Sequence, residues 1–145
     1  MSDLSVNKRA LFDYEIAEKF TAGIELTGHE AKSAKMGRMD IAGCHAIVRG
    51  GELYLTGTTI HSFQPGNAPA EYDPTRTRKL LMKHEEIRYL TGKLNSGLTL
   101  VPLKAYTHHG FVKIELGLGR GRKKSDKREV VKKREVERDI RRASA

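Results

Sequence analysis

The residues of this 145-residue sequence that could act together chemically are the Lys and Arg side chains crowded into its C-terminal end. Residues 120–145 hold 12 Lys and Arg against 5 Asp and Glu, a net of +7 out of +9 for the whole chain. A run of cations neutralises phosphates and releases their counterions, which favours binding to nucleic acid. A membrane-surface helix would need Trp, Phe or Leu along one face, and this run contains none. We therefore expect an RNA or DNA partner and no membrane; the alternative is a solvated tail that only aids solubility.

The same run has too few apolar residues to fold against the rest of the chain. After Lys124 its larger apolar residues are Val130, Val131, Val136 and Ile140, which do not share one side of a helix. An isolated helix of this length is marginal in water. We predict that residues 120–145 are disordered when free and fold against a polyanion.

A smaller basic cluster lies near the N-terminus. Asn7, Lys8 and Arg9 precede two aromatic residues, Phe12 and Tyr14. Cations suit phosphate contacts, and aromatic rings suit the stacking of unpaired bases. The cluster is a candidate RNA contact, and a solvated surface explains it equally well.

A third basic cluster alternates with threonine in the middle of the chain, where it contains Arg76, Arg78 and Lys79. In an extended segment the side chains of Arg76 and Arg78 point to the same side. This pair is a second candidate RNA contact, with the same alternative of a solvated surface.

Catalytic and metal-binding chemistry find little support. Four histidines are far apart, and His108 and His109 are adjacent, so no metal-ligand spacing results. Cys44 with His45, or Ser33 with a distant histidine, could be imagined as nucleophile and base, but no known signature surrounds them. We expect no metal, no cofactor and no enzymatic activity.

Glycines at 117, 119 and 121 superficially resemble a phosphate-binding loop. They lack the Gly-Lys-Ser/Thr that such a loop requires, and they follow the last predicted strand. We interpret them as hinge glycines that release the tail.

The bulk numbers suit one domain, residues 1–119, followed by the basic tail, residues 120–145. The sequence shows no apolar run of 18 residues and no apolar N-terminal signal region. One cysteine, Cys44, excludes an internal disulfide and fits a reducing compartment, so we expect a cytoplasmic protein.

Apolar alternation and turn residues predict a mainly β domain. We predict a small OB-like barrel of about six strands with two short flanking helices. The strands are expected at residues 12–16, 20–26, 44–48, 53–56, 98–106 and 111–116, and the helices at 31–36 and 83–91.

Local signals refine this outline. Residues 1–6 are expected to be loose, residues 21–23 to hold a bulge, and residues 64–69 to form a loop. Thr27 and Glu30 have the spacing of a helix capping box. Gly50-Gly51 predicts a hairpin turn, Gly92 the end of the second helix, and Pro102 an edge strand or a bulge.

Four motifs stand in an order that resembles the SmpB family of SsrA-binding proteins. The resemblance covers residues 7 to about 142, and it is carried by Asn7-Lys8-Arg9-Ala10, Gly28-His29-Glu30-Ala31-Lys32-Ser33, Asp73-Pro74-Thr75-Arg76-Thr77-Arg78-Lys79-Leu80-Leu81 and Gly121-Arg122-Lys123-Lys124-Ser125-Asp126-Lys127-Arg128.

The resemblance implies an RNA-binding adaptor. Proteins of this family bind the tRNA-like domain of transfer-messenger RNA and enter stalled ribosomes with it. There the tail is expected to become helical in the empty messenger channel near the decoding centre. Alanyl-tRNA synthetase and elongation factor Tu would be indirect partners, through the RNA.

By position, the resemblance also implies site residues. The RNA-binding set is Asn7, Lys8, Arg9, Tyr14, Glu30, Lys32, Arg76, Arg78, Lys79 and Leu81, although capping alone explains Glu30. The ribosome-binding tail set is Arg122, Lys123, Lys124, Asp126, Lys127, Arg128, Lys132, Lys133 and Arg134.

The sequence departs from the family pattern at three places. Thr21 stands where the family usually has a Glu of the RNA-facing set, Ala31 replaces a usual Val, and Ala143-Ser144 replace the large apolar residues of some relatives. Two rival functions stay open: an OB protein that binds ribosomal RNA without a partner RNA, and an enzyme that acts on RNA.

Overall fold

The computed structural model describes residues 2–62 and 72–122, and beyond them Arg128, Lys132, residues 134–136 and Arg138. The helices and strands follow in the order β1 (Ser2–Val6), α1 (Ala10–Asp13), β2 (Tyr14–Ile24), α2 (Gly28–Lys35), β3 (Met39–Asp40), β4 (His45–Arg49), β5 (Glu52–Thr56), β6 (Thr59–Ile60), β7 (Arg78–Leu81), α3 (His84–Asn95), β8 (Thr99–His108) and β9 (Phe111–Gly121). The mainly β fold class is confirmed, because the described part of residues 2–122 contains nine strands and three helices.

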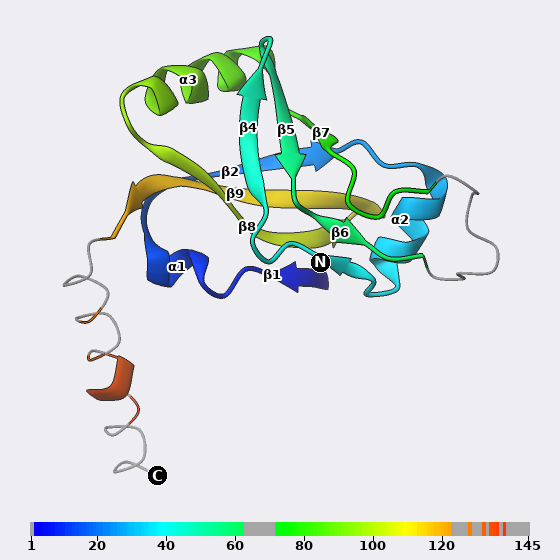
Figure 1. Ribbon diagram of the computed structural model, residues 1–145, viewed down its shortest axis with the longest axis horizontal. Coiled ribbons are helices and arrows are strands. Elements are labelled where there is room, and N and C mark those ends of the chain that lie inside the picture. The colour runs from blue at the N-terminus through cyan, green and yellow to red at the C-terminus, as the bar shows by residue number, and fades with distance from the viewer. Residues whose placement is uncertain are drawn as a thin grey trace.

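Seven strands form one antiparallel sheet in the order β1-β8-β9-β2-β7-β5-β4, and β3 pairs with β6 separately. The sheet curls, so that β4 at one edge contacts β8 near the other edge. Figure 1 shows the β4–β5 hairpin crossing in front of β2, β8 and β9, with α1 and α2 at opposite ends of the sheet. This curl gives the sheet the barrel-like form that encloses the core.

Apolar side chains at alternate strand positions form the core. Leu53 and Leu55 of β5, Leu80 of β7, and Ile114 and Leu116 of β9 are all fully buried. Side chains at alternate positions of a strand point to one face, so these residues turn inward together. Helix α3 adds its predicted apolar side, Ile87 and Leu90, to the same core.

Strand β2 corrects one prediction. Two strands at residues 12–16 and 20–26 were expected, with a bulge at residues 21–23, and the structure has one strand that pairs with β9 along its length. The register shifts between Ile16 and Glu18 instead, so Ala17 is the bulge. Residues 10–13 form α1, because the apolar Ala10 turns into a small second cluster with Val101 and Leu103.

The glycines at the end of β9 correct a second prediction. Strand β9 continues to Gly121, two residues past the predicted domain boundary, so these glycines are strand residues and not hinges. A Cβ on Gly119 would lie 2.0 Å from the carbonyl oxygen of Glu15, beside the bulge in β2. Gly119 therefore allows the two backbones to approach each other.

Three other elements, β1, α3 and β8, also differ from expectation. Residues 1–6 are not loose, because β1 pairs with β8. Helix α3 passes through Gly92 and ends before Gly97, whose φ of 99° suits only glycine. β8 is not an edge strand; the register shift beside Pro102 confirms the alternative, a bulge.

Other local predictions are confirmed. The capping box of Thr27 and Glu30 opens α2. Gly50 and Gly51 both have positive φ and join β4 to β5, as a two-residue hairpin turn requires. The loop expected at residues 64–69 lies outside the described residues.

The close approach at Gly119 gives a stability prediction. Gly119→Ala should destabilise the fold by about 3 kcal/mol or more, because the new methyl group overlaps backbone that cannot move without breaking β2–β9 pairing. Gly92→Ala is the matched control: it meets nothing within 4 Å and should stabilise α3 by about 0.5–1 kcal/mol. Urea unfolding measures both, and equal stabilities for the two variants would contradict the packing described.

Candidate nucleic-acid interface

A buried carboxylate organises the segment before β7. Glu30 is fully buried, and its backbone and side chain form both halves of the capping box with Thr27. The guanidinium of Arg78 donates to Glu30 Oε2 through Nε at 2.9 Å and through a terminal nitrogen at 2.7 Å. Arg76 donates to both oxygens of the same carboxylate.

Arg78 is a structural residue, which corrects its assignment to the RNA-binding set. It is fully buried, and besides Glu30 it donates to the carbonyl oxygens of Thr58, Pro74 and Arg76, each at 3.0 Å. RNA cannot reach a guanidinium so enclosed. Glu30 leaves the RNA-binding set for the same reason, and capping is confirmed as its role.

The pKa of Glu30 reflects this enclosure. Burial alone would raise it, but the hydrogen bonds from Arg76, from the Thr27 backbone and from Arg78 outweigh burial and hold the pKa below its ordinary value of 4.5. Glu30 therefore stays ionised and stabilises the folded chain at neutral pH.

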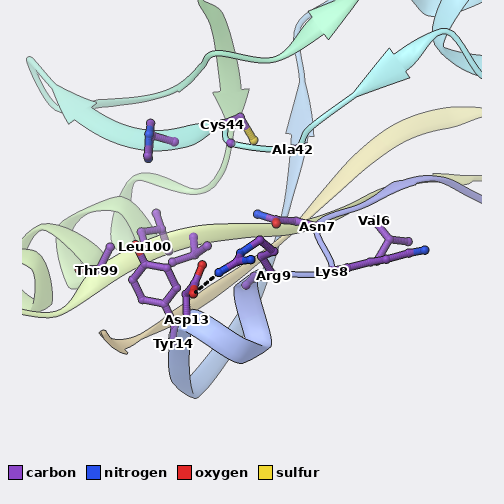
Figure 2. Close-up of a pocket in the computed structure, with 14 residues that line it drawn as sticks. Val6, Asn7, Lys8, Arg9, Asp13, Tyr14, Ala42, Cys44, Thr99 and Leu100 are labelled. Carbon is purple, nitrogen blue, oxygen red and sulfur yellow. Dashed lines mark hydrogen bonds and ion pairs between the residues drawn. The ribbon is translucent and has the colours of Figure 1, made fainter. Parts of the chain in front are cut away.

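Four of the predicted RNA-binding residues, Asn7, Lys8, Arg9 and Tyr14, gather around α1. Together with residues 42–45 and 99–101 they line an open cleft of about 390 Å³. In Figure 2 the side chains of Arg9 and Asp13 face each other across the helix turn, whereas Lys8 extends away from them. Asn7 donates its amide to the carbonyl oxygen of Pro102, so its side chain has a structural role at the bulge of β8. Tyr14 packs against the small apolar cluster under α1.

The start of the tail lies beside this helix. Gly121 pairs with Tyr14, and the backbone N–H of Arg122 donates to the carbonyl oxygen of Asp13 at 2.8 Å. The cationic segment therefore leaves the folded chain next to α1.

From α1 a continuous surface crosses the outside of the sheet, and we call it the outer sheet face. It is formed by Lys104 of β8, Lys113 and Glu115 of β9, Lys19, Thr21 and Gly23 of β2, and Leu81 of β7. Tyr106 of β8 belongs to the same rows of side chains but is buried. A second cleft of about 320 Å³, lined by Lys8, Lys19, Lys104 and Glu115 among others, joins this face to the α1 end.

Ion pairs neutralise the middle of the outer sheet face. Glu115 contacts Lys19 at 3.8 Å and Lys104 at 3.7 Å, and Lys104 also contacts Asp3 at 3.6 Å. These partly exposed pairs add little stability. Their consequence is that two lysines of this face are already matched by carboxylates.

Four strands bring a different set together at the far part of this face. Tyr106 is in register with Lys113, Lys113 with Gly23, and Gly23 with Leu81. Leu81 is half exposed, and a Cβ on Gly23 would touch both Leu81, at 3.4 Å, and the Lys113 ammonium, at 3.8 Å. Sequence reasoning found only Leu81. Lys113 was missed, although the alternation from 111 to 116 places it opposite the buried Val112 and Ile114.

The remaining predicted residues lie elsewhere. Lys32 is exposed on α2, and Arg76 is partly exposed at the Glu30 carboxylate. Lys79 pairs with Glu52 at 3.5 Å. Since α1 and α2 occupy opposite ends of the sheet (Figure 1), the structure does not unite all ten predicted residues into one site.

The tail set is described only in part. Lys123, Lys124, Asp126, Lys127 and Lys133 lie outside the described residues. Arg128, Lys132 and Arg134 are helical and exposed, and Arg122 is half-buried. Disorder of the free tail stays a prediction.

The candidate nucleophile does not fit catalysis. Burial raises the pKa of the Cys44 thiol to about 11, so the thiolate needed for attack is absent at neutral pH. Ser33 is also fully buried. Among the residues that the structure describes, no group of three or more His, Cys, Asp or Glu could hold a metal ion, and no helix is long and apolar enough to cross a membrane.

Comparisons with known proteins agree on one family. A family model described as "SmpB protein" matches residues 4–145. The SsrA-binding protein of Synechococcus elongatus is 52% identical over 97% of this chain and 92% of its own length. That of Gloeobacter violaceus is 48% identical over 94% of this chain and 90% of its own. A solved chain from "tmRNA-SmpB: a journey to the center of the bacterial ribosome" has a TM-score of 0.66 and 44% identity, covering 87% of this chain and 92% of that one.

The buried ion pair yields the prediction of this section. Glu30→Gln should destabilise the fold by about 3–5 kcal/mol, because the buried Arg78 loses its counter-charge. Glu52→Gln is the control: its pair with Lys79 is partly exposed and should be worth about 1 kcal/mol or less. Urea unfolding at pH 7 compares the two.

The pH dependence of the same variants tests the cause. The pKa of Glu30 is lowered in the folded chain. The carboxylate's contribution to the free energy of unfolding is therefore fully present above pH 4.5 and is lost as the pH falls through the folded pKa. The stability gap between wild type and Glu30→Gln should therefore narrow below pH 4.5. A gap that stays constant down to pH 3 would show that the carboxylate charge is not its origin.

Proposed function

Because the chain belongs to the SmpB family, we propose that it binds the tRNA-like domain of transfer-messenger RNA and brings that RNA to stalled ribosomes for trans-translation. The family consists of RNA-binding adaptors and not of enzymes. The relatives are SsrA-binding proteins, and the similar solved chain comes from a study of tmRNA with SmpB in the bacterial ribosome. Alanyl-tRNA synthetase and elongation factor Tu take part through the RNA.

The outer sheet face and the α1 end carry the RNA contact in this proposal. The supporting observation is that Lys8, Thr21 and Leu81, which are far apart in sequence, border one surface that β1, β8, β9, β2 and β7 build together. Its cations that pair with no carboxylate among residues 2–62 and 72–122 lie at the two ends, at Lys8 and Lys113. A folded RNA has phosphates spaced along its backbone that such separated cations can meet.

Thr21 fits this proposal despite the departure from the family pattern. It is in register with Glu115 of β9, and its hydroxyl lies 3.5 Å from the hydroxyl of Tyr106. Glu115 thus provides a carboxylate beside the position where the family resemblance leads us to expect one. Contacts with 2′-hydroxyls or base amino groups could use it.

The tail has a separate role. Its net charge of +7 against +2 for residues 1–119 suits a partner far more anionic than a small RNA domain, and ribosomal RNA in an empty messenger channel is such a partner. Phosphate neutralisation there offsets the entropy lost as the tail becomes helical. The residues proposed for this step are Arg122, Lys123, Lys124, Asp126, Lys127, Arg128, Lys132, Lys133 and Arg134.

A truncation tests this division. A chain that ends at Arg122 keeps β9 and the contact of Arg122 with Asp13. It should bind the isolated tRNA-like domain as the full chain does, and it should not support peptide tagging on stalled ribosomes. Replacing Lys127 and Arg128 by Ala should reduce tagging more weakly. Tagging by the truncated chain would refute the role of the tail, and loss of RNA binding would refute the role of the sheet face.

One experiment separates this function from its rivals. The chain is pulled from a bacterial lysate and the bound RNA is sequenced. The proposal predicts one dominant small RNA with a tRNA-like domain. Bulk ribosomal RNA would favour a ribosome-binding OB protein, and cleavage of labelled RNA by the pure chain would favour an enzyme.

A further inference from the structure

The tip of the β8–β9 hairpin carries an aromatic ring that the fold does not use. His109 and Gly110 have φ values of 50° and 79° and close the turn. Directly after it, Phe111 is 68% exposed, the largest exposed fraction among the exposed large apolar residues of the described chain. Strand alternation buries Val112 and Ile114, so Phe111 must point outward. No core contact accounts for an aromatic residue here.

The surroundings of this ring are cationic. Lys113, on the same face of β9, places its ammonium nitrogen 6.0 Å from the centroid of the Phe111 ring. It makes no ion pair with any residue that the structure describes, in contrast to Lys19 and Lys104, which share Glu115. His108 is in register with Phe111, and the rings of His108 and His109 lie 4.0 Å apart. Lys113 is therefore a cation available for an anionic partner.

The neighbouring surface continues from this tip along the sheet. Gly23 is in register with both Lys113 and Leu81. A Cβ on Gly23 would lie 3.4 Å from Leu81 and 3.8 Å from the Lys113 ammonium, so these two side chains lie close together over Gly23. The hairpin tip, Lys113 and Leu81 are thus parts of one continuous surface.

We propose that the tip of the β8–β9 hairpin is a stacking site for one unpaired base of the bound RNA, with Phe111 as the platform and Lys113 on an adjacent phosphate. This inference rests on the proposed RNA-binding function and names a contact that sequence reasoning did not find. An aromatic ring beside a free cation is the combination with which proteins hold single-stranded nucleotides.

The composition of the tip favours RNA over a protein partner. Protein docking sites present contiguous apolar surface. Here one exposed ring is flanked by a lysine and two histidines, and the nearest other exposed apolar residue of this face, Leu81, lies beyond Lys113 and Gly23. Such spacing suits the alternation of base and phosphate along a nucleotide strand.

The test measures the affinity of the full-length chain for the isolated tRNA-like domain of transfer-messenger RNA at fixed salt. Phe111→Ala should weaken binding by about 5- to 100-fold, as the loss of one stacked base requires. Phe111→Trp should bind at least as well as wild type, and Phe111→Leu, which keeps apolar area without a π face, should bind nearly as weakly as the alanine variant. Met36→Ala, at an exposed apolar residue after α2, is the matched control and should bind normally.

Salt dependence separates the two side chains. Lys113→Met should lower the slope of log affinity against log salt by about 0.7–0.9, the value for one lost phosphate contact, whereas Phe111→Ala should leave the slope unchanged. Urea unfolding should show that both variants are as stable as wild type, because neither side chain contacts the core.

The outcomes are distinguishable. If wild type itself does not bind the RNA, the proposed function fails. If wild type and Met36→Ala bind and Phe111→Ala binds equally well, the stacking site is refuted. Rescue by leucine would replace stacking with a plain apolar contact and also refute it. Normal RNA affinity combined with weakened ribosome binding would assign the tip to a ribosomal partner and overturn the inference.

Discussion

The architecture of the surface proposed to bind RNA depends on one buried carboxylate. Glu30 caps α2, neutralises Arg78 inside the fold and holds Arg76 at its edge. With Arg78 and Leu80 drawn inward, strand alternation forces Lys79 and Leu81 outward. Leu81 then comes to lie beside Gly23 on the outer sheet face. In the sequence Arg78 resembles an RNA contact, but in the structure it lies inside the fold. Its buried position determines that Lys79 and Leu81 point outward.

The outer sheet face is nearly neutral, and the excess positive charge lies in the tail. The middle of the outer sheet face is neutralised by Asp3, Lys104, Glu115 and Lys19, and the surplus on residues 1–119 is only +2. A nearly neutral surface with a few separated cations selects a partner by shape as well as charge, whereas a segment of +7 binds any dense phosphate array. Because Arg122 is held at Asp13, the cationic segment begins beside α1, at one end of that surface.

Sequence patterns predicted what depends on neighbours in the chain. The capping box of α2, the Gly50-Gly51 turn and the buried side of α3 all follow from local spacing, and all are present. Long-range pairing was harder to predict. The bulge at Ala17 interrupts the apolar alternation of β2, so one strand was interpreted as two. The apolar alternation of β1 is too short to predict a strand that pairs with β8. Arg78 was misassigned because nothing local shows that a carboxylate 48 residues away surrounds it. Lys113 was missed because, within a strand, an isolated lysine is typical of any solvated face.

The central claim is that folded RNA meets the outer sheet face and not the α2 end. Amide NMR of the chain titrated with the isolated tRNA-like domain tests it most directly, because the same titration reports on both regions. The account predicts that the largest shifts fall on Lys8, Thr21, Gly23, Leu81 and Lys113, while α2 and the backbone of Arg76 change little. Shifts concentrated on α2 and Arg76, with the outer sheet face unperturbed, would contradict it.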